Sequence, residues 1–168
     1  MRLDDAALVA SEYATDARLR RRASVFRTGD VQRLAVEAIV EAQPRRVLEV
    51  GCGWGELAAR VAAETGAEIV AVDVSPRMVE LARERGIDAR VGDVQQLAFA
   101  DGEFDCALAA WMLYHVADLD RGLAELARVL RPGGRLVAAT NGARSLPENC
   151  PLPRENGLDP AHRSPAAA

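Results

Sequence analysis

The feature that most constrains this chain is a short apolar run followed by three closely spaced glycines. Residues 46–50 are largely apolar and stop at Gly51, and Gly53 and Gly55 follow at alternate positions. A run of this kind is typical of a parallel strand that is buried on both faces. Glycines after such a strand let backbone amides approach a ligand closely. The pattern therefore predicts a strand, a ligand-binding loop and a helix, in that order.

Strand-like and helix-like segments alternate along the chain from residue 30 onward. Apolar runs predict strands over 46–50, 69–72, 87–91, 104–110 and 135–140, and apolar residues at helical spacing predict helices over 30–43, 55–65, 76–86 and 119–130. This alternation is typical of a mostly parallel sheet with right-handed crossovers and helices on both faces. We therefore expect an α/β fold, a Rossmann-like doubly wound sheet of about five strands.

Capping and turn residues mark the expected ends of these segments. Asp30 is expected to cap the first helix, and Gly66 to end the second. Ser75 is an N-cap for the third helix, with Pro76 at its first position. Residues 131–134 read Arg-Pro-Gly-Gly, which predicts a turn before the fifth strand.

Composition narrows the classes of partner and chemistry. The net charge of −4 provides no positive field for general nucleic-acid binding, so no nucleic-acid partner is expected. All 21 basic residues are arginine, so lysine Schiff-base chemistry is absent. Cys52, Cys106 and Cys150 show neither a paired framework nor metal-ligand spacing, so we expect a reducing cytoplasm and no metal site. The N-terminus has no continuous apolar stretch, so neither a signal peptide nor a membrane span is expected.

The spacing of the glycines argues against two other nucleotide-binding loops. A dinucleotide fingerprint needs its third glycine at the position of Glu56. A phosphate-binding P-loop needs a lysine, which this chain lacks. A nicotinamide-dependent oxidoreductase is therefore disfavoured.

Five motifs, in order, resemble class I S-adenosylmethionine-dependent methyltransferases of the small-molecule type. They are EVGCGWG at 49–55, IVAVDVSPRM at 69–78, GDV at 92–94, FDCAL at 104–108 and LRPGGRL at 130–136. The resemblance implies a strand order of 3-2-1-4-5, S-adenosylmethionine as cofactor and methyl transfer to a small-molecule acceptor.

The resemblance also implies which residues bind the methionine and ribose parts of the cofactor. Gly51, Cys52 and Gly53 would line the methionine part, and Glu49 would shape the loop or meet the amino group through water. Asp73 would accept hydrogen bonds from both ribose hydroxyls, which suit a carboxylate. Asp73 can alternatively cap the following helix, and Cys52 can simply be a small residue that fits a tight loop.

The adenine site is implied in the same way. Asp93 would accept from the adenine amino group, and Val94 would offer its backbone amide to the ring. Val74 and Met78 would pack on the adenine, and Ala110 would lie beside the cofactor after the fourth strand. Asp93 can also be an ordinary turn residue, and Met78 can be core filler.

Methyl transfer depends on alignment of the nucleophile with the methyl carbon, so no universal catalytic residue is expected. His115 is the one histidine before the C-terminal tail and is the candidate base, although it can equally be a packed or capping residue. Trp111 and Tyr114 either face the acceptor or belong to the core. Tyr13 and the arginines at 18–22 belong to an expected N-terminal helical lid, although a solvated face explains the arginines as well.

The C-terminal region departs from the family pattern. Five prolines after residue 146 interrupt any periodicity, so the expected division is a lid at 1–28, a cofactor-binding domain at 29–142 and an irregular tail at 143–168. The family continues with further strands, so the fifth strand is expected to be an edge that the tail, a second copy in a homodimer or another partner covers. A truncated relative that binds cofactor without turnover is the alternative function.

Overall fold

A computed structural model describes residues 29–140. The expected lid at 1–28, with Tyr13 and the arginine cluster, lies outside these residues. The expected tail at 143–168 does so too. The described part is therefore the segment for which the sequence predicts alternating strands and helices.

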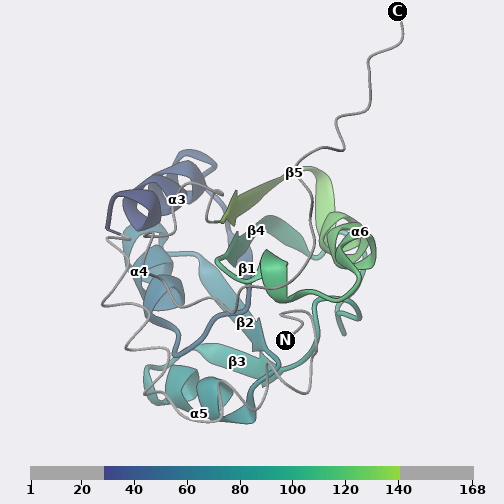
Figure 1. The fold of residues 1–168 in the computed structure, drawn as a ribbon. Coiled ribbons are helices and arrows are strands. Elements are labelled where there is room, and N and C mark those ends of the chain that lie inside the picture. Colours follow the sequence, from purple (N-terminus) through teal and green to yellow (C-terminus); the bar gives the residue numbers. More distant parts are fainter. Residues whose placement is uncertain (1–28, 141–168) are drawn as a thin grey trace, which may run out of the picture.

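Five parallel strands form one sheet in the order β3-β2-β1-β4-β5 (Figure 1). The strands are β1 (Arg46–Val50), β2 (Glu68–Asp73), β3 (Asp88–Val91), β4 (Phe104–Ala110) and β5 (Leu130–Ala139). The order reverses direction between β1 and β4, so the carboxyl ends of these two strands border the expected ligand crevice. The predicted fold class and strand order are confirmed.

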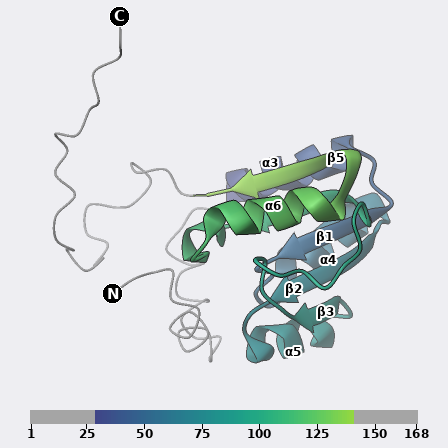
Figure 2. The ribbon, with the colours of Figure 1, turned by 90° about the vertical axis from the view of Figure 1, so that its right-hand side faces the viewer.

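Helices cover both faces of the sheet. They are α3 (Gly29–Glu41), α4 (Glu56–Thr65), α5 (Pro76–Glu84) and α6 (Leu119–Val129), with a short 3-10 helix η1 (Leu113–His115). In Figure 2, α6 lies in front of the sheet, whereas α3 and α4 lie behind it. Because all five strands are parallel, each helix returns the chain to the edge where the strands begin. The loops that follow the strands therefore gather at the opposite, carboxyl edge.

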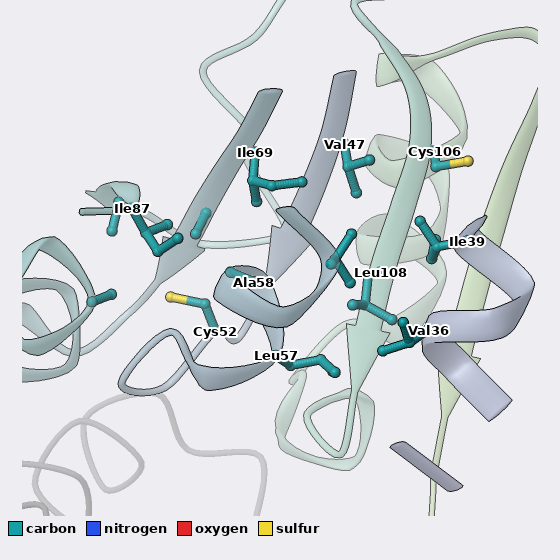
Figure 3. Packing of buried hydrophobic residues seen from close by; sticks show 14 of the residues in the cluster. Val36, Ile39, Val47, Cys52, Leu57, Ala58, Ile69, Ile87, Cys106 and Leu108 are labelled. Atoms are coloured by element: carbon teal, nitrogen blue, oxygen red, sulfur yellow. The ribbon is translucent and has the colours of Figure 1, made fainter. Parts of the chain in front are cut away.

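Two buried clusters fill the space between the sheet and its helices. On the face of α3 and α4, Val36 and Leu57 pack with Leu108 of β4 (Figure 3). On the opposite face, Phe104 of β4 packs with Leu126 of α6, and both side chains are fully buried. Central strands apolar on both faces explain why β1 and β4 match their predicted bounds.

The predicted caps of α4 and α5 are present. The Ser75 hydroxyl accepts a hydrogen bond from the Met78 amide at 3.4 Å, with Pro76 at the first helical position. Gly66 ends α4 in the left-handed conformation. The prediction for Asp30 is wrong, because α3 begins at Gly29 and already includes Asp30. A helix often extends a residue beyond its apolar face, so the pattern misplaced this boundary.

The predicted turn at 131–134 is part of β5 instead. Leu130 pairs with Phe104, and Arg135 pairs with Cys106, so residues 131–134 bulge opposite a single residue of β4. β5 pairs with β4 both before and after the bulge. The strand therefore begins at Leu130, five residues before the predicted start at 135.

Candidate functional site

The loops after β1, β2 and β3 are tied to one another at the carboxyl edge of the sheet. The Gly51 amide donates to the Val72 carbonyl at 2.7 Å, and the Gly92 amide donates to the Asp73 carbonyl at 3.0 Å. The Gly53 amide donates to Asp73 Oδ2 at 2.9 Å. These bonds bring the predicted residues of the first three motifs to one place.

The glycine loop has a backbone that only glycine adopts easily. Gly51, Gly53 and Gly55 have φ angles of 67°, 54° and 76°. A Cβ on Gly51 would lie 2.6 Å from Met112 Cβ, and one on Gly55 would lie 2.9 Å from Ala82 Cβ. The loop is therefore closed by neighbours on two sides, and Met112 is a site residue that the sequence did not predict.

Glu49 is a buried carboxylate with an unsatisfied oxygen. Its side chain comes from β1, is 3% exposed, and Oε2 has no hydrogen-bond partner. Burial raises the pKa of Glu49 to about 8, the negative charge of Asp73 adds to this, and the Ala58 amide opposes it. An orphaned buried acceptor of this kind needs an explanation, and a bound cationic donor supplies one.

Asp73 holds both halves of the site together. Its Oδ1 accepts from the Ser75 amide and its Oδ2 from the Gly53 amide, both at 2.9 Å. Burial raises the pKa of Asp73, and these two hydrogen bonds oppose the shift. The carboxylate thus does brace the start of α5, yet each oxygen keeps a second lone pair for a ligand hydroxyl.

Glu49 and Asp73 together place two buried carboxyl groups at this edge. Within residues 29–140 neither of them forms an ion pair. A ligand that carries an ammonium group and a pair of hydroxyls matches these acceptors. S-adenosylmethionine has both, so the residues present fit the cofactor that the motifs imply.

The Asp93 carboxylate follows β3 and contacts Gln95. Gln95 donates to Asp93 Oδ1 from its backbone amide at 2.9 Å, and its side-chain Nε2 lies 3.0 Å from Oδ2. Asp93 therefore is a turn residue, as the alternative interpretation expected. Its carboxylate also retains acceptor capacity, so a role in ligand binding stays a prediction. Gln95 was not predicted, although an amide two residues after an aspartate is a recognisable turn signal.

The predicted adenine-packing residues differ in burial. Met78 is 1% exposed on the inner face of α5, and Val94 is 5% exposed in the cluster beneath α6. Val74 and Ala110 are half-buried at the ends of their strands. Met78 therefore contributes to the core, while Val74 and Ala110 remain accessible at the edge.

The segment after β4 turns sharply. Trp111 has a φ of 55°, which is rare for a bulky residue, and its amide donates to the Ala139 carbonyl at 2.7 Å. The turn places Met112 against Gly51 and begins η1 at the same end of the sheet. Trp111 packs on the buried cluster of α3 and α4, as the core alternative expected.

His115 and Tyr114 lie in η1, with their ring centroids 4.4 Å apart. His115 is half-buried and Tyr114 is exposed. Both lie shortly after β4, at the carboxyl end of the sheet.

Cys52 belongs to the core and not to the reactive surface. Its thiol is 7% exposed and lies 3.6 Å from the Gly53 carbonyl. Burial is the main reason that its pKa is raised, and the nearby carboxylates of Glu49 and Asp73 add to it. The thiol therefore stays protonated and acts as a small packing group. In the described part of the chain no three His, Cys, Asp or Glu residues are grouped to hold a metal ion.

Comparison with known proteins identifies the same region. A family model described as a methyltransferase domain matches residues 48–138, more than half of the chain. A demethylmenaquinone methyltransferase from Thermus thermophilus is 40% identical over 132 residues, covering 74% of this chain and 54% of that protein. The chain spans about half the length of the curated relatives it matches, including the ubiquinone/menaquinone C-methyltransferases.

Solved structures match the fold as well. A SAM-dependent methyltransferase from Thermotoga maritima, described as a possible histamine N-methyltransferase, has a TM-score of 0.55 and 29% identity, covering 76% of this chain and 60% of its own. The [4+2]-cyclase SpnF has a TM-score of 0.57 and 35% identity, covering 64% and 43% respectively. Among the helices within residues 29–140, none is long and apolar enough to cross a membrane.

Proposed function

The chain belongs to the family of methyltransferase domains, and we propose that it transfers the methyl group of S-adenosylmethionine to a small-molecule acceptor. The observation that carries this proposal is the buried pair of Glu49 and Asp73 beside the glycine loop. Glu49 Oε2 has no partner, and Asp73 accepts two backbone amides while keeping acceptor capacity.

The proposed binding roles follow from this geometry. Glu49 meets the ammonium group of the cofactor, directly or through water, and the backbone of Gly51, Cys52 and Gly53 lines its methionine part. Asp73 accepts from the ribose hydroxyls, because its two oxygens each have a lone pair available. The positive charge of the ligand would offset the burial, and the smaller effect of Asp73, that raise the pKa of Glu49.

The adenine is placed between the ends of β2 and β3. Asp93 accepts from its amino group, and the Val94 amide donates to the ring. Val74 and Met78 pack against it, and Ala110 borders the cofactor from β4. Val74 and Ala110 are the accessible members of this set, which supports their contact with a ligand.

The cofactor supplies an electrophilic methyl group on a sulfonium when it is bound. The protein contributes alignment of the acceptor with that methyl group. We assign His115 the role of a base that removes a proton from the acceptor atom, because η1 places it beside the end of β4.

The remaining proposals concern boundaries, partners and location. Residues 29–142 form the cofactor-binding domain, preceded by a lid at 1–28 and followed by an irregular tail at 143–168. The partner is a small molecule and not a nucleic acid, and a homodimer through the edge of β5 is supported by the exposure of Leu136 on that strand. A cytoplasmic setting is supported by Cys52 and Cys106, which are free and buried.

A second candidate is a domain that binds the cofactor without methyl turnover. The likeness to a structure described as a [4+2]-cyclase favours this candidate, since a similar fold there carries a different activity. A turnover assay with labelled donor separates the two. Demethylmenaquinone, for which the Thermus relative is named, is the first acceptor to test, in its oxidised and reduced forms.

Titration calorimetry with S-adenosylmethionine tests the proposal. We expect Asp73→Ala to weaken binding by at least about a hundredfold, because hydrogen bonds from two hydroxyls to a charged group are lost. Asp88→Ala is the matched control, because Asp88 begins β3 at the opposite end of the sheet and pairs with Arg90. No heat of binding with the parent protein, or equal affinity of the parent and Asp73→Ala, would contradict the proposal.

A further inference from the structure

We propose that Gln95 is a positioning residue that fixes Asp93 as an acceptor, so that the site selects a 6-aminopurine over a 6-oxopurine. The inference rests on the proposed function, because it assumes that Asp93 faces the adenine amino group. It begins from the contacts of one amide: Gln95 Nε2 lies 3.1 Å from Asp93 Oδ1 and 3.0 Å from Oδ2.

The orientation of the Gln95 amide is determined by its other end. Gln95 Oε1 accepts a hydrogen bond from the Asp118 backbone amide at 2.8 Å. A backbone N–H can only donate, so the oxygen of the amide must face Asp118 and its nitrogen must face Asp93. The amide nitrogen of Gln95 therefore holds the Asp93 carboxylate in a fixed orientation.

The loop that carries Gln95 is held against α6 at several points. Arg121 Nε donates to the Gln95 carbonyl at 2.8 Å, and the Leu97 amide donates to Glu125 Oε2 at 2.8 Å. Gly122 leaves room for close packing, since a Cβ there would lie 3.4 Å from Val94 Cγ1. Asp93 is therefore oriented relative to a rigid helix and not only by its own turn.

This arrangement has a consequence for the ligand. The two donors from Gln95 contact the Asp93 carboxylate and leave it with unused lone pairs for a ligand donor. An exocyclic amino group donates to such a carboxylate, whereas an exocyclic oxygen at the same position is repelled. Gln95 thus acts on purine selectivity through Asp93, without touching the purine itself.

The test compares two ligands that differ at purine position 6, S-adenosylhomocysteine and S-inosylhomocysteine, by calorimetry on the full chain. We expect the parent protein to favour the amino ligand by about tenfold to a hundredfold, the effect of one hydrogen bond to a charged group. Gln95→Met removes the amide, and Gln95→Glu keeps the acceptor for Asp118 but removes the donor to Asp93. We expect both variants to reduce the preference to within about threefold.

Gln96→Glu is the matched control, since Gln96 is the exposed neighbour and the change in charge is the same. It should retain the preference of the parent. A merely structural Gln95 would weaken both ligands equally and leave the ratio unchanged, and that result would overturn the inference alone. A parent protein that binds neither ligand contradicts the proposed function as well, and one that binds both equally contradicts the role of Asp93.

Discussion

Two aspartates, Asp73 and Asp105, each bind two backbone amides, but they lie at opposite ends of the sheet. Asp105 lies near the amino end of β4 and accepts from the amides of Arg45 and Arg46 at 2.6 and 2.9 Å. Its other oxygen pairs with Arg131 at 2.9 Å. Burial alone would raise the pKa of Asp105, but the two amides and the guanidinium hold it below its usual value.

Asp73 lies at the carboxyl end of β2, and no cation within residues 29–140 pairs with it. It accepts from the amides of Gly53 and Ser75, and its charged neighbour is the carboxylate Glu49. Burial therefore dominates, and the pKa of Asp73 is raised. Each aspartate accepts two backbone amides, but the deep burial of Asp73 and the guanidinium beside Asp105 shift the two carboxyl pKa values in opposite directions.

The largest expected effect is the pH dependence of stability that Glu49 causes at the carboxyl end of the sheet. The pKa of Glu49 is about 8 in the folded protein, and its ordinary value of 4.5 applies to the unfolded chain. Between these two pH values the folded state therefore binds more protons than the unfolded state. Stability should therefore fall as pH rises from about 5 to 8, by about 2–4 kcal/mol at roughly 1.4 kcal/mol per unit. Glu49→Gln should flatten this profile, as measured by urea unfolding without ligand at each pH. Parallel profiles for parent and variant would mean that Glu49 does not carry the effect.

The next prediction compares a glycine at each end of the sheet. Gly51→Ala should destabilise the protein by about 2–4 kcal/mol, because the left-handed backbone is strained and the new Cβ would lie 2.6 Å from Met112 Cβ. Gly133 in the bulge of β5 has a φ of 79° with open space around it, so Gly133→Ala should cost only the conformational part, about 1–2 kcal/mol. Thermal unfolding measures both, and an equal loss would show that the close packing at Gly51 relaxes freely.

A third prediction exchanges the aspartates themselves. At pH 7, Asp105→Asn should reduce stability by about 1–3 kcal/mol and leave S-adenosylmethionine binding unchanged. Asp73→Asn should change stability by less than about 1 kcal/mol, since a neutral amide keeps one acceptor and costs less to bury than a carboxylate, but should weaken binding at least about tenfold. Denaturation and calorimetry on the same samples separate the effects. A binding defect in Asp105→Asn would remove the distinction between the two ends.

Much of this fold follows from local sequence signals. The bounds of β1 and β4 match prediction because both strands are apolar on both faces and end at sharp turns. The start of β5 does not match its prediction. Leu130 belongs to the strand because it pairs with Phe104 before the bulge, and no local pattern reveals this pairing.

The site divides in the same way. Glu49 and Asp73 were predictable because each stands at the end of an identifiable strand. Gln95 depends on a contact with Asp118, 23 residues away, and Met112 on one with Gly51, across β2 and β3. Such contacts exist only once the sheet order brings the loops together, so the sequence predicts the two carboxylates but not the residues that position the site.

The smallest expected effect comes from a substitution that makes the surroundings of Asp105 more like those of Asp73. Arg131→Ala removes the cation from Asp105, and because Arg131 is 58% exposed the loss of stability should stay below about 1 kcal/mol at pH 7. The pKa of Asp105 should rise, since only its two amides and the charge of Arg45 then oppose the effect of burial. A carboxyl group whose pKa is lowered by folding stabilises the protein at pH values above its unfolded pKa, and this stability is lost as pH falls through the folded pKa. When Arg131 is removed, the loss should begin at a higher pH, so the acid unfolding midpoint should move to higher pH. Carboxyl carbon NMR titration of the parent and Arg131→Ala measures this directly. An unchanged pKa would mean that Arg131 does not lower the pKa of Asp105, and that the different burial of the two aspartates distinguishes the two ends of the sheet.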